Sequence, residues 1–386
     1  MEKVQLTKRG EKNLYKGISL LEKEDIVPAD TKDGLVELVS RTGRFVATAY
    51  LSEQHKGSGW VIAKEKIKPD HSFFVHLFRQ AKKARLAYQN DTTTTAYRLF
   101  NQDGDGFGGL IIDRYGDFAL FSWYNAFIYK IRDVIVDAFC EVFPELRGAY
   151  EKCRFNSKMP ESSHLYGATA PEVFEILENN VTYQVFLNDG LMTGIFLDQH
   201  DIRKRLVDGL AGGQRLLNLF SYTAAFSIAA AIGGASQTTS VDLAKRSVDL
   251  STAHFRANGL DLTNHRLVVM DVFDYFRYAK RHGLTYDVIV IDPPSFARHK
   301  KQTFSVLKDY HRLVNEALDI LNSDGLLILS TNASTLSVEQ FQKQIRKGLG
   351  QRAYDIISLD RLPDDFKVNK DDERSNYLKV FTIKVR

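Results

Sequence analysis

Acidic residues recur at the ends of β-type runs in the second half of the chain. The apolar run Arg215–Leu219 leads into the small-residue turn Ser221–Ala225. Two further runs end at Asp242 and Asp271, and the series closes with Asp292-Pro-Pro-Ser-Phe296. Because open α/β sheets bind ligands beyond the carboxyl ends of their strands, this order predicts a small-molecule site at one edge of a parallel sheet.

The turn after the first run indicates which ligand it can bind. It has no glycine, whereas the dinucleotide fingerprint needs glycines so that backbone can approach a pyrophosphate. The phosphate-binding pattern GxxxxGK followed by Ser or Thr is also absent from the sequence. These features favour a ligand with a sugar and a base but no phosphate, and S-adenosylmethionine is such a ligand.

Two carboxylates are placed to hold such a ligand. Asp242 comes 24 residues after Asn218 and ends the second strand, where a carboxylate can accept both ribose hydroxyl protons. Asp271 ends the third strand and is suited to accept from an adenine amino group. Considered singly, each Asp is better explained as a helix N-cap or a turn residue. Only their common order with Asp292 favours the functional interpretation.

The segment from Asp292 to Phe296 predicts how a second substrate is held. Its prolines, Pro293 and Pro294, stop the fourth strand and fix the backbone that follows. Asp292 and nearby carbonyl groups are left facing the ligand, beside the ring of Phe296, which can stack on a flat base. This arrangement suits a planar, polar methyl acceptor. The alternative is a strand that the prolines merely terminate.

The elements that position these residues follow from the pattern. Alternating strands and helices from residue 188 to the end predict a doubly wound sheet. Short alternating runs in residues 1–70 predict a compact β-barrel, and residues 71–187 predict a middle α/β segment that begins with a helix. The expected fold is multidomain α/β, with domains at 1–70, 71–187 and 188–386.

The composition limits the class of protein. Of the 386 residues, 44% are apolar and 26% charged, as in soluble globular proteins, and no apolar run approaches the length of a membrane span. With two cysteines, Cys140 and Cys153, and no metal-binding histidine spacing, neither a disulfide framework nor a metal is expected. The polar N-terminus lacks a signal-peptide core, so the expected location is cytoplasmic.

Basic residues concentrate near the N-terminus. The first hundred residues carry 18 Lys and Arg against 12 Asp and Glu, although the net charge of the chain is only +4. Such a surplus suits a polyanionic partner, and a solvated helix face explains it equally well. The basic run His299-Lys-Lys301 is likewise suited either to phosphate contact or to a solvated loop.

Four motifs carry a resemblance to a known family. Asn218-Leu-Phe-Ser-Tyr-Thr223 resembles the first motif of the class I methyltransferases that modify bases of large-subunit ribosomal RNA, with Ala224-Ala225 in place of a glycine pair. Thr193–Gln199 resembles that family's TGxFLDQ segment, Asp113–Gly116 its DRYG and Asp292–Phe296 its DPPxF. The similarity spans nearly the whole chain.

The resemblance implies an N-terminal PUA-like RNA-binding barrel, a Rossmann-like methyltransferase sheet, S-adenosylmethionine as cofactor and RNA, in particular 23S ribosomal RNA, as partner. It implies that Asp292, Pro293, Pro294 and Phe296 position the base for an in-line transfer. The residues implied for the cofactor pocket are Phe196, Asp198, Gln199, Asn218, Phe220, Ser221, Asp242 and Asp271. The sequence leaves open whether the protein is a monomer or a homodimer.

One position departs from the family pattern. Members that form 5-methylcytosine use a cysteine after the next strand, because a thiolate must add to the base before its C5 carbon can attack. This chain has Asn332 there, within Leu329–Ser334. The departure points away from 5-methylcytosine. Direct attack by an exocyclic amine or a ring nitrogen of the base is the simpler alternative.

Three functions are compatible with these features, and the sequence supports the first best. The first is an S-adenosylmethionine-dependent RNA base methyltransferase. The second is a catalytically weakened methyltransferase fold that acts as an RNA-binding ribosome assembly factor. Ala224-Ala225 and the missing cysteine motivate it, whereas the intact Asp242, Asp271 and Asp292 oppose it. The third, a small-molecule methyltransferase, is disfavoured by the basic N-terminal region.

Overall fold

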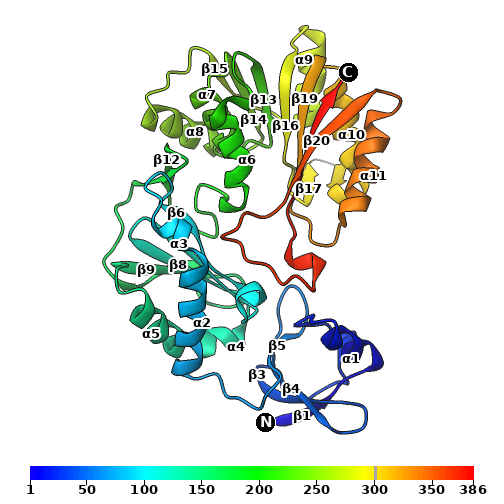
Figure 1. Ribbon diagram of the computed structural model, residues 1–386. Coiled ribbons are helices and arrows are strands. Elements are labelled where there is room, and N and C mark those ends of the chain that lie inside the picture. Colours follow the sequence, from blue (N-terminus) through cyan, green and yellow to red (C-terminus); the bar gives the residue numbers. More distant parts are fainter. Residues whose placement is uncertain (300–301) are drawn as a thin grey trace. The chain divides into compact units, whose positions relative to one another are not determined.

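A computed structural model describes residues 1–299 and 302–386, without the side chains of 297–303. The chain forms two compact units (Figure 1). The first comprises Met1–Phe174, Phe186–Thr193 and Asp364–Ser375, and the second comprises Glu175–Val185, Gly194–Pro363 and Asn376–Arg386. Residues 71–187, expected as one middle segment, are therefore shared between the two units.

The N-terminal part of the first unit is a five-stranded sheet with the order β1-β3-β4-β5-β2. Its strands are β1 (Glu2–Gln5), β2 (Leu20–Leu21), β3 (Gly34–Val39), β4 (Phe45–Leu51) and β5 (Gly59–Ala63). Helix α1 (Lys8–Tyr15) begins after Thr7, whose hydroxyl accepts a hydrogen bond from the Gly10 N–H. The sheet encloses a small apolar core of its own, as expected for the strand-rich start of the chain.

A second five-stranded sheet of the first unit has the order β10-β9-β8-β7-β6. Its strands are β6 (Ala96–Asn101), β7 (Leu110–Tyr115), β8 (Phe118–Trp123), β9 (Gly148–Cys153) and β10 (Ser162–Gly167). The helices of this part are α2 (His71–Ala84), α3 (Leu86–Gln89), α4 (Ala126–Lys130) and α5 (Arg132–Val142). Phe78 of α2 packs edge-on against Phe100 of β6 and Phe139 of α5, so one aromatic core joins helices and sheet.

A segment from far along the chain completes the first unit. Arg85 is fully buried and donates to both carboxylate oxygens of Asp105, at 2.6 Å each. It also donates to the main-chain carbonyl of Asp365, at 2.6 Å. A buried guanidinium needs such partners because an unpaired buried charge is strongly destabilising. No sequence pattern predicted that Asp364–Ser375 would belong to this unit.

The second unit is built on a seven-stranded sheet with the order β15-β14-β13-β16-β19-β21-β20. Neighbouring strands are parallel, except that β21 is antiparallel to both β19 and β20. The strands are β13 (Arg215–Leu219), β14 (Gln237–Asp242), β15 (His265–Val269), β16 (Tyr286–Ile291), β19 (Leu321–Thr331), β20 (Tyr354–Asp360) and β21 (Lys379–Val385). The predicted doubly wound sheet is confirmed.

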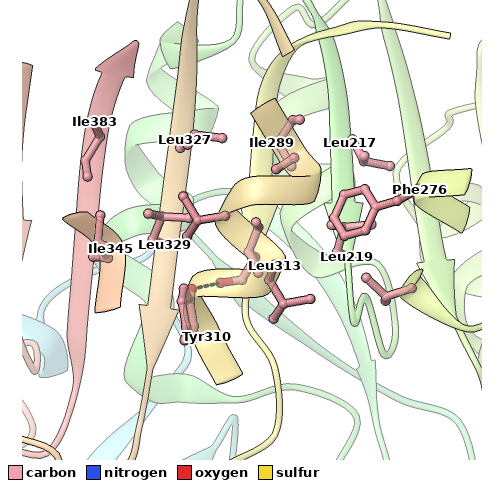
Figure 2. Packing of buried hydrophobic residues seen from close by; sticks show 14 of the residues in the cluster. Leu217, Leu219, Phe276, Ile289, Tyr310, Leu313, Leu327, Leu329, Ile345 and Ile383 are labelled. Atoms are coloured by element: carbon pink, nitrogen blue, oxygen red, sulfur yellow. Dashed lines mark hydrogen bonds between the residues drawn. The ribbon is translucent and has the colours of Figure 1, made fainter. Parts of the chain in front are cut away.

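Helices cover both faces of this sheet because successive side chains of a strand point to opposite sides. Leu217 and Leu219 of β13 belong to the apolar core formed with α9 (Val272–Arg281), α10 (Val306–Leu318) and α11 (Val338–Leu349). Figure 2 shows this core, in which the Tyr310 hydroxyl donates to the Ile291 carbonyl at 2.8 Å. Leu216 lies in the opposite core, with α6 (His200–Arg205) and α7 (Ala225–Ile232).

Smaller elements complete the second unit. These are α8 (Arg246–Ala257) and the two hairpins of β11 (Phe174–Glu178) with β12 (Val181–Val185) and β17 (Phe296–His299) with β18 (Gln302–Ser305). Thr182 of β12 exchanges two hydrogen bonds with the Asn258 side chain after α8, which explains why this hairpin joins the second unit. Within the described ranges, no helix is long and apolar enough to cross a membrane.

Candidate functional site

The predicted site residues meet at one edge of the seven-stranded sheet. Asp242 is the last residue of β14, and Asp271 and Asp292 follow β15 and β16. Since β15, β14, β13 and β16 are successive parallel neighbours, these carboxyl ends share an edge. The order of the strands in the sheet therefore brings Asp242 and Asp292, which are 50 positions apart in the sequence, to the same edge.

The turn after β13 is held in a strained conformation. Phe220, Tyr222 and Ala224 have positive φ angles of 58°, 48° and 62°, a region that non-glycine residues rarely adopt. Each such residue costs about 1–3 kcal/mol and persists only where its surroundings impose it. The Ser221 N–H donates to the Val241 carbonyl at 3.0 Å and thereby fixes the turn to β14. Strain of this kind clusters at ligand sites, which supports a functional interpretation of the turn.

The Thr193–Gln199 segment runs alongside this turn. The Gly194 N–H donates to the Tyr222 hydroxyl at 3.1 Å, and Thr223 Oγ1 donates to the Gly194 carbonyl at 2.7 Å. The rings of Phe196 and Tyr222 lie 5.5 Å apart between centroids. Tyr222 and Thr223 were not assigned to the site from the sequence, although both belong to the Asn218–Thr223 motif that resembles the first motif of the family. The contacts bring two motifs of the sequence into one structure.

Gln199 joins this segment to the Asp292 loop. Its Nε2 donates to Asp292 Oδ2 at 2.6 Å, and its Oε1 accepts from Ser330 Oγ at 3.4 Å. The Asp198 carboxylate accepts from the Tyr377 hydroxyl at 3.0 Å. Burial, with a smaller contribution from the nearby Asp198, raises the pKa of Asp292 to about 6, although the hydrogen bonds from Ser330 and Gln199 oppose the shift. Gln199 therefore couples the predicted cofactor residues to the predicted base loop.

The two acids at the strand ends keep capacity for a ligand. Asp242 Oδ2 accepts from the Tyr222 N–H and Asp242 Oδ1 from the Ala244 N–H, both at 2.8 Å. Asp271 caps α9, because its Oδ1 accepts from the N–H groups of Phe273 and Asp274. The other carboxylate oxygen of Asp271 is not used in the cap. An ionised carboxylate has about four acceptor sites, so both acids can bind further hydroxyl or amino groups.

Asn218 and a narrow hollow complete the edge. Asn218 Nδ2 donates to Ser227 Oγ at 3.2 Å, whereas its buried Oδ1 has no hydrogen-bond partner among the described residues. The lining of the hollow includes Ser221, Asp242 and Leu267. Small-molecule sites usually enclose ~300–1,000 Å³, and the hollow is too small to enclose such a ligand.

The base loop presents an exposed aromatic ring. Pro293 is buried, whereas Pro294 and Ser295 are exposed, and Phe296 is 63% exposed. An exposed aromatic ring is available to stack on a flat partner such as a base. Lys300 and Lys301 of the basic run lie outside the described residues, and the side chain of His299 is likewise not described. The described part of the chain holds no group of three metal-ligating side chains.

Comparison with known proteins decides the family. A sequence model of the S-adenosylmethionine-dependent methyltransferases matches residues 153–354, and a model of the PUA-like domain matches residues 4–64. The chain belongs to the S-adenosylmethionine-dependent methyltransferase family. The methyltransferase is 40% identical to YwbD of Bacillus subtilis, which is named as a candidate ribosomal RNA large subunit methyltransferase, and the match covers 99% of each chain.

Further relatives agree with this assignment. Ribosomal RNA large subunit methyltransferase I of Aeromonas salmonicida is 30% identical, over 91% of this chain and 90% of the relative. Among solved structures, SMU.776, a candidate methyltransferase complexed with SAH, matches with a TM-score of 0.96 at 58% identity over 100% of both chains. A candidate methyltransferase from Streptococcus mutans matches with a TM-score of 0.95 at 57% identity, also over 100% of both chains.

The methyltransferase uses S-adenosylmethionine, and its residues fit that cofactor. The unpartnered Oδ1 of Asn218 and the spare acceptor sites of Asp242 and Asp271 suit the amino and hydroxyl groups of the cofactor. The Gly-poor turn also suits a ligand without a pyrophosphate. The individual roles of the eight cofactor residues and the four base-loop residues remain predictions.

Asp242→Ala is expected to weaken binding of S-adenosylhomocysteine by isothermal calorimetry. Loss of a charge-assisted contact corresponds to on the order of 1.5–3 kcal/mol, or about 10- to 150-fold in Kd. Asp261→Ala is the matched control, because Asp261 also accepts a backbone N–H in a turn, that of Thr263, but lies away from this edge. Equal affinity in the Asp242 variant and the parent would remove Asp242 from the cofactor site.

Proposed function

We propose that the methyltransferase modifies a base of large-subunit ribosomal RNA. The whole-length similarity to YwbD carries this proposal, because the shared part includes both the PUA-like and the methyltransferase regions. The relative from Aeromonas salmonicida has a name of the same kind. The exposed Phe296 beside Asp292 supports a planar acceptor, since unstacked bases are commonly held on aromatic rings.

A basic face of α1 supports an RNA partner. Lys8, Lys12 and Tyr15 are spaced so that they lie on one side of the helix, and Lys16 follows at its end. All four are exposed, Tyr15 by 95%, and the described residues pair none of the three lysines with an acid. The acid of this helix, Glu11, is already bound to an arginine. Unpaired cations beside an exposed ring suit a nucleic-acid strand, through phosphate contact and base stacking.

The chain's own residues orient the reactants. S-adenosylmethionine supplies an electrophilic methyl group when bound. Gln199, fixed by Asp292 and Ser330, holds the cofactor segment against the base loop, and Phe296 offers a stacking surface to the acceptor base. Neither cysteine lies in the second unit, since Cys140 and Cys153 belong to the first. We therefore propose direct attack by an exocyclic amine or a ring nitrogen, with catalysis arising mainly from orientation.

Methyl transfer to RNA tests this function directly. The purified protein would be incubated with isotope-labelled S-adenosylmethionine and large-subunit ribosomal RNA from cells that lack the gene, and digested nucleosides would be identified by mass spectrometry. One labelled nucleoside, methylated on nitrogen, is expected. Absence of label would overturn the proposed function. Labelled 5-methylcytosine would retain the function but contradict direct attack by nitrogen.

Reversing charge on α1 is expected to weaken RNA binding. Lys8→Glu/Lys12→Glu should raise the Kd for this RNA at least 10-fold and reduce the slope of log Kd against log salt by about one per lysine, because phosphate contacts release counterions. The matched control is Lys343→Glu/Lys347→Glu, a pair with the same spacing on the exposed side of α11. Equal losses in both variants would show a net-charge effect and exclude a specific role of α1.

A further inference from the structure

Asn332 lies just beyond the carboxyl end of β19, between two residues whose positions are fixed. The Ala333 N–H donates to Thr331 Oγ1 at 3.2 Å, and Lys379 Nζ donates to the Ala333 carbonyl at 2.9 Å. Lys379 is only 2% exposed, and a buried ammonium is tolerated only where acceptors compensate it. The side chain of Asn332 is nevertheless exposed. The structure thus holds one exposed amide on a rigid support.

The orientation of this amide is fixed by Ser295. Ser295 Oγ donates to Asn332 Oδ1 at 3.1 Å, and the Ser295 carbonyl accepts from the Val306 N–H at the start of α10. An Asn amide has two donor hydrogens and one acceptor oxygen. With its oxygen engaged by Ser295, Asn332 keeps both hydrogens of Nδ2, for which the described residues offer no acceptor. The group therefore presents donors to a partner.

This donor group lies at the edge where the acceptor base is expected. Strands β16 and β19 are adjacent and parallel, with Ile291 opposite Leu329, so the loops that follow them leave the sheet together. Asn332 comes three residues after Leu329, and Ser295 four residues after Ile291. Phe296, 63% exposed, is the next residue of the same loop. A base bound at this ring would therefore lie close to the loops that carry Ser295 and Asn332.

We propose that Asn332 is a specificity-determining residue, whose Nδ2 donates a hydrogen bond to an acceptor atom on the edge of the target base. Ser295 is the positioning residue that keeps the amide in the donating orientation. The inference rests on the proposed function, an RNA base as methyl acceptor. Asn amides discriminate bases by their edges in nucleic-acid recognition. A base that turned an exocyclic amine toward Asn332 would be disfavoured, because two N–H donors would then meet.

Asn332→Asp tests the proposal, because it keeps the shape of the side chain and removes both donors. The kcat/KM for large-subunit ribosomal RNA is expected to fall about 100-fold at pH 7.5, while the Kd for S-adenosylhomocysteine stays unchanged. The ratio of variant to parent activity should rise about threefold as pH is lowered from 7.5 to 5.5, since a few per cent of an Asp with an ordinary pKa of about 4 is protonated at pH 5.5 and regains a donor. A merely structural role of Asn332 would not give this pH dependence.

Two further variants separate hydrogen bonding from charge and position. Thr335→Asp adds the same charge at an exposed position three residues away and should leave kcat/KM within twofold of the parent. Ser295→Ala should reduce kcat/KM less than Asn332→Asp, because the released amide can still rotate into place. An Asn332→Asp variant that methylates as fast as the parent at pH 7.5 would overturn the proposal. If the parent itself transfers no methyl group to this RNA, the proposed function fails and this inference fails with it.

Discussion

Asp292→Asn is expected to stabilise the second unit and to remove most of the methyltransferase activity. The folded-state pKa of Asp292 is raised from 3.8 to about 6, chiefly by burial, so the fold favours the protonated carboxyl and opposes the ionised one. The resulting loss of stability appears as pH rises from about 4 to about 6 and is complete above that range. An uncharged Asn removes it, which corresponds to on the order of 3 kcal/mol at pH 7.5.

The loss of activity follows from the Gln199 contact. Gln199 Nε2 donates to Asp292 Oδ2 at 2.6 Å, and Ser330 also hydrogen-bonds to this carboxylate. An Asn offers one acceptor oxygen where the carboxylate offers two, so one contact is lost, and displacement of a reactant by about 1 Å can reduce a rate 100-fold. The parent's kcat/KM is therefore expected to fall with decreasing pH below about 6, as Asp292 takes up its proton, and Asp292→Asn should be slow and lack this dependence. The opposite result, a variant that is fast and less stable than the parent, would make Asp292 a structural residue.

The stability of the Asp292→Asn variant should be measured by a method that reports unfolding of the second unit alone. Both tryptophans, Trp60 and Trp123, lie in the first unit, so tryptophan fluorescence does not follow unfolding of the second. Hydrogen exchange of peptides from β13 and β16, analysed by mass spectrometry, gives the local free energy of unfolding instead. Asp201→Asn, a change to an exposed acid of α6, is the matched control.

The architecture of the second unit was predictable because its strands are recognisable one by one. Val288–Ile291 is apolar on both sides, as expected for a central parallel strand, and Asp292 follows it directly. The Asp364–Ser375 segment was not predictable, because its place depends on Arg85 and Arg98, more than 260 residues earlier. Sequence periodicity reports local structure and carries no information on pairing at such a separation.

The sequence predicted which motifs form the site and in which order they occur. It did not predict the hydrogen bonds that these residues make. Asp271 caps α9, which is the alternative that its sequence context favoured, and Asp242 both supports a turn and keeps acceptor capacity. The absence of glycines from the turn is one of the two features that favour a weakened function. The structure shows Ala224 in the left-handed conformation that a glycine would adopt with less strain, so the turn is present without one. This removes one of the two observations that motivated a catalytically weakened protein.

Arg203→Met is expected to lower the free energy of unfolding of the second unit by about 3–5 kcal/mol. Arg203 Nε and Nη2 donate to the two carboxylate oxygens of Glu178 at 2.5 and 2.8 Å, and the two side chains are only 3% and 1% exposed. Removal of the guanidinium leaves a buried carboxylate without its counter-charge. Hydrogen exchange in β12 and β13 should show the loss. Arg205→Met is the matched control, because Arg205 also belongs to α6 but pairs with Asp360 near the surface. It should lower the free energy of unfolding by about 1 kcal/mol or less.

The double variant Arg203→Met/Glu178→Met separates stability from cofactor binding. It leaves no buried charge, so most of the stability is expected to return, as in other replacements of buried ion pairs by apolar residues. Arg203 Nη2 also donates to the Phe196 carbonyl at 2.7 Å, and the double variant does not restore this bond. Calorimetry should therefore show weaker binding of S-adenosylhomocysteine, by about tenfold, in a protein as stable as the parent. Parent-like affinity would mean that Arg203 supports only the fold, and that the cofactor segment is held by Gly194 and Gln199 without it.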